Sequence, residues 1–251
     1  MATIEGGFIW YELMTGDVAA AEAFYAKVLG WNMEDAGMPG GHYTLAKVGS
    51  RQVAGIMDIP ADANGAGPVW FGYIRVADVD AAAERVRGAG GAVHRAPSDI
   101  PGVGRFAVVA DPQGAAFMLF RGDGTPAADL APGTPGSIGW HELRARDWTS
   151  AFSFYHDMFG WQKSDAVDMG PMGVYQVFSI NGTGAGGMMN SAEAPPWLYY
   201  FCVENIDAAV TRVADGGGRV TNGPNQVPGG SWIVHAIDPQ GATFAVVGPR
   251  Q

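Results

Sequence analysis

The sequence repeats itself, and the repeat determines how the chain is divided. Three short motifs occur twice in the same order, with offsets of 127 to 130 residues. They are Phe-Tyr-x4-Gly-Trp at 24–31 and 154–161, Asx-x-Asp-Ala-Ala at 78–82 and 205–209, and Asp-Pro-Gln-Gly-Ala at 111–115 and 238–242. Because chance does not produce three ordered matches, the chain is an internal duplication. A fourth pair, Trp-x-Glu-Leu at 10–13 and 140–143, puts one glutamate at the same position in each half.

The two copies indicate two domains joined by a linker. Residues 122–136 are dominated by Gly, Pro, Ala, Asp and Thr and show no hydrophobic period, which is typical of a linker. We therefore expect a first domain at 1–121 and a second at 137–251, each of ordinary domain size.

Each half predicts the same run of elements. Asp17 and Gly30 bracket an apolar helical stripe, as do Asp147 and Gly160, so we expect helices capped at these residues. A second helix is predicted at 79–88 and at 206–214. Asp-Pro-x-Gly predicts a tight turn, since proline presets one φ and glycine accepts a positive one. Strands are predicted at 8–14, 43–48, 53–57, 69–76, 106–110 and 117–120, and in the second half at 175–180, 184–189, 197–203, 233–237 and 243–247. The pattern is βαβββ twice in each half, with modules that pair either within a half or across the two halves.

Composition excludes several classes of partner. The chain has 15 basic and 25 acidic residues, a net charge of -10, which disfavours nucleic acid and anionic membranes. Its single cysteine, Cys202, rules out an internal disulfide and a cysteine-rich zinc site. No signal peptide or membrane span is visible, so we expect a cytoplasmic protein that is a monomer or a homodimer and binds a small molecule.

With these motifs, the chain resembles the vicinal oxygen chelate superfamily, which includes glyoxalase I, bleomycin resistance proteins and extradiol dioxygenases. The resemblance rests on the strand, Asp, helix and Phe-Tyr-x4-Gly-Trp signature and on the Asp-Pro-x-Gly turn, each present twice. It covers nearly the whole chain and is greatest to tandem glyoxalase-like proteins. It implies an α+β fold in which tandem βαβββ modules form cup-shaped sheets.

The resemblance also implies where metal ligands would stand. Six positions can be tested, and none holds a residue that binds a divalent ion: Trp10, Phe71, Met118, Trp140, Leu198 and Ala245. A divalent metal is therefore possible for the family but not expected here, and the predicted cofactor is none. A His–Glu metal site would need His235 with Glu142 or Glu12.

Glu12 and Glu142 are the candidate catalytic residues. They lie two residues beyond the first of these positions in each half, so strand alternation turns them to the same side as Trp10 and Trp140. A carboxylate among aromatic side chains would serve as a general base or as an anchor for a cationic ligand. The alternative is a structural carboxylate that accepts hydrogen bonds in each half.

The same alternation predicts a set of ligand-binding residues around these carboxylates, because aromatic faces suit planar and cationic ligands. The set is Trp10, Phe71, Tyr73, Arg75, Met118, Trp140, Tyr200 and His235. Arg75 would pair with Glu12, bind an anionic group or lie exposed.

Three functions compete. The first is a metal-free protein that binds a small cationic or aromatic molecule in an acidic aromatic cup. The second is a glyoxalase-like lyase or isomerase, or a dioxygenase-related enzyme, with Glu12 or Glu142 as base and a non-standard metal site. The third is a regulatory or structural protein whose cup is filled by its own aromatic side chains.

Overall fold

The computed structural model of the chain describes residues 5–38, 41–61, 63, 65–124, 130–192 and 196–250. Within these residues it contains two eight-stranded mixed sheets and four α-helices, the predicted α+β class. The predicted linker at 122–136 lies partly outside the described residues.

The elements of the first half are β1 (Phe8–Thr15), α1 (Val18–Leu29), β2 (Asn32–Asp35), β3 (Tyr43–Val48), β4 (Arg51–Asp58), β5 (Val69–Arg75), α2 (Val79–Gly88), β6 (Ala92–Ile100), β7 (Gly104–Ala110) and β8 (Ala116–Gly122). Those of the second half are β9 (Ile138–Ala145), α3 (Trp148–Phe159), β10 (Gln162–Asp168), a 3-10 turn η1 (Gly170–Met172), β11 (Val174–Ile180), β12 (Thr183–Asn190), β13 (Trp197–Cys202), α4 (Ile206–Asp215), β14 (Arg219–Gln226), β15 (Trp232–Ile237) and β16 (Thr243–Gly248).

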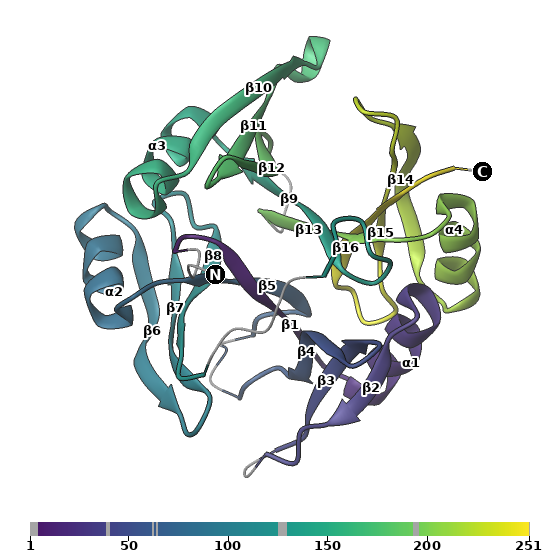
Figure 1. Cartoon of the computed structure of the whole chain (residues 1–251), viewed down its shortest axis with the longest axis horizontal. Coiled ribbons are helices and arrows are strands. Elements are labelled where there is room, and N and C mark those ends of the chain that lie inside the picture. The colour runs from purple at the N-terminus through teal and green to yellow at the C-terminus, as the bar shows by residue number, and fades with distance from the viewer. Residues whose placement is uncertain are drawn as a thin grey trace. The chain divides into compact units, whose positions relative to one another are not determined.

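The strands of each half form one sheet (Figure 1). The first sheet has the order β2-β3-β4-β1-β5-β8-β7-β6, and the second has the equivalent order β10-β11-β12-β9-β13-β16-β15-β14. Two βαβββ modules therefore complete a sheet within one half.

Helix ends follow the local chemistry of the sequence. The Asp17 side chain accepts a hydrogen bond from the Ala20 N–H, and Asp147 accepts one from Thr149. Gly30 and Gly160 both have a φ of 72°, the left-handed conformation that ends a helix most easily with glycine. The predicted caps are confirmed.

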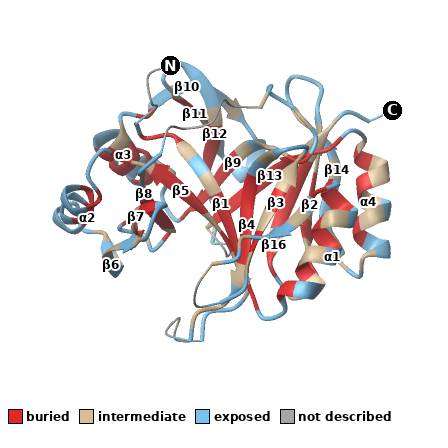
Figure 2. Ribbon diagram, turned by 60° about the horizontal axis from the view of Figure 1, so that its bottom comes forward, coloured by how far each residue is buried: buried red, intermediate tan, exposed pale blue. Residues whose placement is uncertain are grey.

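The outermost strands lie outside the elements predicted from the sequence. β2, β6, β10 and β14 are the edge strands of the two sheets, and most of their side chains are exposed. Figure 2 shows the contrast between the exposed β10 and the buried β13. An exposed edge strand does not need alternating apolar residues, so periodicity does not reveal it.

The helices pair differently from the strands, because the chain packs into two compact units that each draw on both halves. Unit 1 comprises residues 1–10, 71–129 and 141–197, and unit 2 comprises 11–70, 130–140 and 198–251. In unit 1, α2 packs on α3; in unit 2, α1 packs on α4 (Figure 1).

Two buried hydrogen bonds explain the duplicated motifs. In unit 2, the Tyr25 hydroxyl of Phe-Tyr-x4-Gly-Trp donates to Asp238 of the second Asp-Pro-Gln-Gly turn at 3.0 Å. In unit 1, Tyr155 donates to Asp111 of the first turn at 3.2 Å. Burial raises the pKa of both carboxyls, while backbone N–H groups of each turn oppose that shift by hydrogen bonding. The turn of one half therefore holds the helix of the other.

The tryptophans of the same signature act in parallel. The Trp31 indole N–H donates to the Gly136 carbonyl at 2.8 Å in unit 2, and that of Trp161 donates to Gly6 at 2.8 Å in unit 1. Both rings are buried, and each packs in a cluster of aromatic side chains. An indole in a core needs such a partner for its N–H.

Within the described residues, no helix is long and apolar enough to span a membrane.

Candidate functional site

A tyrosine that is not among the predicted site residues holds Glu12. β1 pairs in parallel with β4, with Glu12 opposite Gly55. The Tyr43 hydroxyl donates to Glu12 Oε2 at 2.9 Å, and Glu12 is only 4% exposed. A Cβ on Gly55 would lie 2.0 Å from the Tyr43 hydroxyl oxygen, so the tyrosine occupies the space that a side chain would need.

The second half repeats the glycine and the tyrosine. Glu142 lies opposite Gly187, and a Cβ on Gly187 would lie 2.1 Å from the Tyr175 ring. The sequence carried a signal for both tyrosines, because Tyr43 and Tyr175 begin equivalent predicted strands in the two halves.

Glu142 also contacts an arginine, and the first half has no arginine at the equivalent position. Arg144 Nε donates to Glu142 Oε1 at 2.9 Å, and both side chains are 7% exposed. The position equivalent to Arg144 in the first half is Met14. A buried guanidinium–carboxylate pair neutralises its own charge, and removal of one partner leaves the other uncompensated.

Tyr200 and His235 come together in unit 2. The Tyr200 hydroxyl lies 2.9 Å from His235 Nε2 within hydrogen-bonding reach, and the rings meet edge to face at 5.7 Å. Strand register brings both side chains beside Ala245. A buried cluster of Leu198, Tyr200 and Ala245 forms here, with the half-buried residues Trp140, Ile233 and Val247 packed against it. Five of the positions singled out in the sequence therefore gather in one place: Trp140, Leu198, Tyr200, His235 and Ala245.

The matching residues of the first half lie in unit 1, where Phe71 and Met118 replace Leu198 and Ala245. Tyr73 pairs in register with Met118, and its ring meets Phe120 edge to face at 5.8 Å. Tyr73 and Met118 are buried, whereas Trp10, Phe71 and Arg75 are partly exposed. The predicted pairing of Arg75 with Glu12 stays a prediction.

His141, which precedes Glu142 on β9, is buried in the core of unit 1. Its ring stacks on Phe8 with centroids 4.1 Å apart, and Nδ1 lies 2.6 Å from the Ala185 carbonyl oxygen. Burial lowers the pKa of His141 to about 4, only partly opposed by that hydrogen bond. The residue is a neutral part of the core in unit 1.

The donor set of the described residues does not fit a divalent metal. No three His, Cys, Asp or Glu side chains among residues 5–38, 41–61, 63, 65–124, 130–192 and 196–250 are grouped to hold one ion. Protein sites for zinc and related metals use three or four such ligands. Contacts between polar side chains on the predicted faces include those of Glu12 with Tyr43, Glu142 with Arg144 and Tyr200 with His235.

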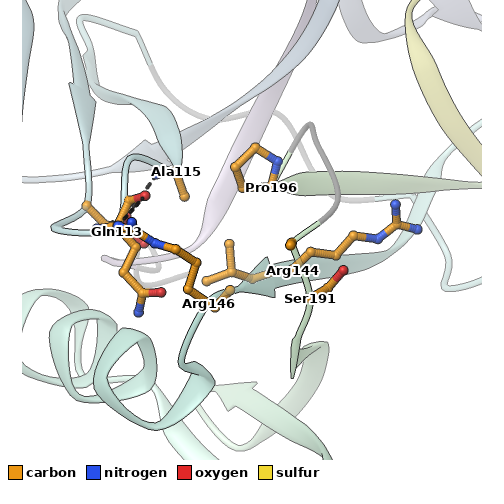
Figure 3. A pocket seen from close by; sticks show the side chains of 10 residues that line it. Gln113, Ala115, Arg144, Arg146, Ser191 and Pro196 are labelled. Carbon is orange, nitrogen blue, oxygen red and sulfur yellow. Dashed lines mark hydrogen bonds between the residues drawn. The ribbon is translucent and has the colours of Figure 1, made fainter. Parts of the chain in front are cut away.

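A separate pocket of about 250 Å³ lies in unit 1, near the start of α3 (Figure 3). None of the predicted site residues lines it. Arg146 extends toward Gln113, whereas the Arg144 side chain runs the opposite way. Arg146 donates to the Gln113 carbonyl at 3.3 Å, and the Gln113 amide bonds to the backbone of Asp147 at 2.7 and 3.0 Å. These polar groups hold the turn against the helix.

Comparison with known proteins shows which family the chain resembles. Residues 7–119 and 137–246 match the model of the Glyoxalase/Bleomycin resistance protein/Dioxygenase superfamily. The chain is 36% identical to the anthracycline biosynthesis protein DauV of Streptomyces sp. (strain C5), over 98% of this chain and 94% of the relative. It is 34% identical to the putative glyoxylase CFP32 of Mycobacterium bovis, over 96% and 94% respectively.

Solved structures give the same fold at lower sequence identity. The Mn(II)-bound glyoxalase of Novosphingobium aromaticivorans superposes with a TM-score of 0.69 at 20% identity, over 99% of this chain and 83% of that one. A substrate complex of homoprotocatechuate 2,3-dioxygenase from Brevibacterium fuscum gives 0.68 at 15% identity, over 99% and 81%. The duplicated signature, the two sheets and these matches agree, and the chain belongs to the glyoxalase/bleomycin resistance protein/dioxygenase superfamily.

Proposed function

We propose that this protein binds a small planar organic molecule on the aromatic face of a sheet, without a metal ion. Trp140 carries the proposal. It stands where the family resemblance expects a metal ligand, it is half-buried, and it packs on the cluster of Leu198, Tyr200 and Ala245. A partly exposed indole beside an apolar floor and a hydrogen-bonding pair suits a flat molecule with few polar groups.

The net charge of the protein limits the classes of ligand that we expect it to bind. The net charge of -10 disfavours strongly anionic molecules, so a neutral or cationic aromatic compound is the better candidate. Glu142 forms an ion pair with Arg144, and Glu12 accepts a hydrogen bond from the Tyr43 hydroxyl. We take Glu12 as the acidic anchor for a cation. The relative named for anthracycline biosynthesis supports an aromatic ligand, since anthracyclines are planar polycyclic compounds.

Two measurements test the proposal together. Protein purified without chelator is expected to contain metal far below one ion per chain by elemental analysis. Binding of a flat aromatic probe such as 2-naphthol, followed by NMR titration, is expected to be unchanged by EDTA. A stoichiometric divalent metal, or loss of probe binding on chelation, would overturn the metal-free function.

An enzymatic function is the second candidate. The Tyr43 phenol and the Glu12 carboxylate form a hydrogen-bonded pair, which offers a base beside a proton donor. The relative named a putative glyoxylase agrees with this direction. Turnover of the hemithioacetal of methylglyoxal that is lost in E12Q would favour the enzyme, whereas no turnover by the wild-type protein would remove this candidate.

A further inference from the structure

The cavity of unit 1 near the start of α3 is separate from the surface that the proposed function uses. Its volume is about 250 Å³, and its walls come from the Asp-Pro-Gln-Gly turn of the first half, the end of β9 and the chain between β12 and β13. Trp140, which carries the proposed function, belongs to unit 2. Ligand pockets commonly measure about 300–1,000 Å³, so this cavity suits only a small molecule.

Part of the cavity wall is apolar. It consists of Ala115, Leu143, Ala145, Ala192 and Pro196, of which the first three are buried. These side chains can contact the apolar body of a ligand, and they offer it no hydrogen bond.

Three polar side chains of the wall bond within the protein. The Asp111 carboxylate accepts hydrogen bonds from N–H groups of its own turn and from the Tyr155 hydroxyl. The Gln113 carboxamide bonds to the backbone at the start of α3. Arg144 Nε donates to Glu142, and in Figure 3 its side chain runs away from Arg146. These groups maintain the fold around the cavity.

Arg146 is less fully engaged. Its side chain is exposed, and its Nη2 donates to the Gln113 carbonyl at 3.3 Å, longer than the usual range of about 2.7–3.2 Å. Among the residues that the structure describes, no carboxylate forms an ion pair with it. A guanidinium carries several N–H donors and binds a carboxylate through two parallel hydrogen bonds. Arg146 therefore offers donors to an anion at the exposed border of a partly apolar cavity.

The duplicated half shows that the turn does not require this arginine. Gly16 stands at the position of Arg146, although the Asp-Pro-Gln-Gly turn is kept at 238–241. Ile59 takes the place of Ser191 in the equivalent backbone hydrogen bond to the end of the first strand. The guanidinium and the smaller serine side chain therefore belong to unit 1 alone.

From these contacts we propose that the cavity binds a small carboxylate with an apolar body. The Arg146 guanidinium pairs with the carboxylate, and Ala115, Ala145 and Pro196 contact the apolar body. The net charge of -10 disfavours ligands with several negative charges, which limits the site to a monoanion. This second site goes beyond the proposed function and is independent of it.

Benzoate and benzamide test the site, because they have nearly the same shape and differ in charge. Both dissociation constants are measured by NMR titration of the full chain. The wild-type protein is expected to prefer benzoate, which should shift the backbone amide signals of Ala145, Arg146 and Ala192 and leave the Trp140 indole signal in place. R146Q is expected to weaken benzoate binding about tenfold or more, the effect of losing hydrogen bonds between charged groups, and to leave benzamide nearly unchanged.

Two further variants separate the local contact from other causes. R219Q, which removes one positive charge from the edge strand β14 of unit 2, is the matched control and should leave both dissociation constants unchanged. S191I, which copies Ile59, should weaken binding of both probes because it narrows the cavity. Thermal unfolding of every variant shows that it is folded.

Several results would overturn the assignment. If the wild-type protein does not bind benzoate, or if R146Q binds it as tightly as the wild-type protein, the cavity is not a carboxylate site. The same conclusion follows if R219Q weakens benzoate binding as much as R146Q, since net charge would then explain the effect, or if only the Trp140 signal shifts. The proposed function stands or falls separately, by the titration with 2-naphthol.

Discussion

Glu12 and Glu142 occupy the same position in two copies of one strand, yet their surroundings differ. Each lies opposite a glycine whose missing side chain makes room for a tyrosine, Tyr43 in one half and Tyr175 in the other. Glu142 is also paired with Arg144. The duplication has kept the sheet geometry at both places, and the second half has an arginine, Arg144, where the first has Met14.

The difference separates two roles that the sequence could not. A carboxylate in a buried ion pair is costly to disturb and has its charge cancelled, which fits a structural role for Glu142. Glu12 accepts a hydrogen bond from the Tyr43 hydroxyl, and a base beside a proton donor fits the role in binding or catalysis that we propose for it. Symmetry of the motif alone argued for the same role in both halves.

The largest effect is expected from R144M, which gives the second half the residue of the first. Glu142 would remain buried without its guanidinium partner, so the free energy of unfolding should fall by about 3–5 kcal/mol. Urea denaturation of the variant measures this. The double variant E142Q/R144M removes both charges and should recover most of the loss. Equal stability of R144M and the wild-type protein would show that the pair does not hold the second half together.

The next largest effect concerns the pH dependence of stability and His141, the residue that precedes Glu142. His141 has Tyr11 as its counterpart, and burial lowers the pKa of His141 to about 4 from 6.5. A histidine with a lowered folded-state pKa takes up its proton more readily when unfolded, so its contribution to stability is present above pH 6.5 and is lost as the pH falls toward 4. A shift of this size corresponds to a loss on the order of 3 kcal/mol.

H141Y, which copies Tyr11, isolates this contribution. Asp111 and Asp238 have raised pKa values, and their protonation favours the folded state as the pH falls. The wild-type curve of stability against pH therefore contains opposing contributions. As the pH falls from 6.5 to 4, the wild-type protein should lose stability relative to H141Y by on the order of 3 kcal/mol, measured by denaturation at several pH values. A constant difference would contradict the prediction.

A smaller effect on stability is expected at the glycine that both halves have opposite the glutamate. G55A introduces a Cβ that would meet the Tyr43 hydroxyl at 2.0 Å, and G187A would meet the Tyr175 ring at 2.1 Å. Each tyrosine must move, which should cost about 1–3 kcal/mol of stability, measured by thermal unfolding. In a Y43A background, G55A should cost much less, because the clash is removed. An undiminished cost in that background would mean that the backbone, not the tyrosine, requires glycine.

What the sequence could predict was local or repeated. Asp17 and Gly30 mark a helix because capping depends on adjacent residues, and the repeat predicts the same helix in the second half. The edge strand β10 escaped prediction because its exposed side chains follow no apolar period. The hydrogen bonds of Tyr25 to Asp238 and Tyr155 to Asp111 escaped because they join distant segments.

In the candidate site, too, local features could be predicted from the sequence and contacts between strands could not. Alternation along a strand predicted Glu12, Trp140 and Tyr200 as site residues, but their partners come from other strands. Tyr43 reaches Glu12 from β3, and His235 reaches Tyr200 from β15, so only strand register reveals the pairs. Arg144 is an exception: it lies two residues from Glu142 on the same strand, and comparison with Met14 would have found it.

The smallest effect is expected from E12Q, and it tests the contrast between the glutamates most directly. A glutamine carbonyl still accepts the Tyr43 hydroxyl, so the free energy of unfolding should change by only about 1 kcal/mol, the difference between a charged and a neutral acceptor. E142Q, by contrast, leaves the buried Arg144 uncompensated and should be clearly more destabilising. Y43F removes the donor without changing charge, and a double-mutant cycle of E12Q with Y43F gives their coupling by denaturation. If E12Q destabilises the protein as much as E142Q, Glu12 is a structural carboxylate and the two halves use their glutamates alike. If E12Q is mild and weakens binding of a cationic aromatic probe, the charge of Glu12 acts on the ligand.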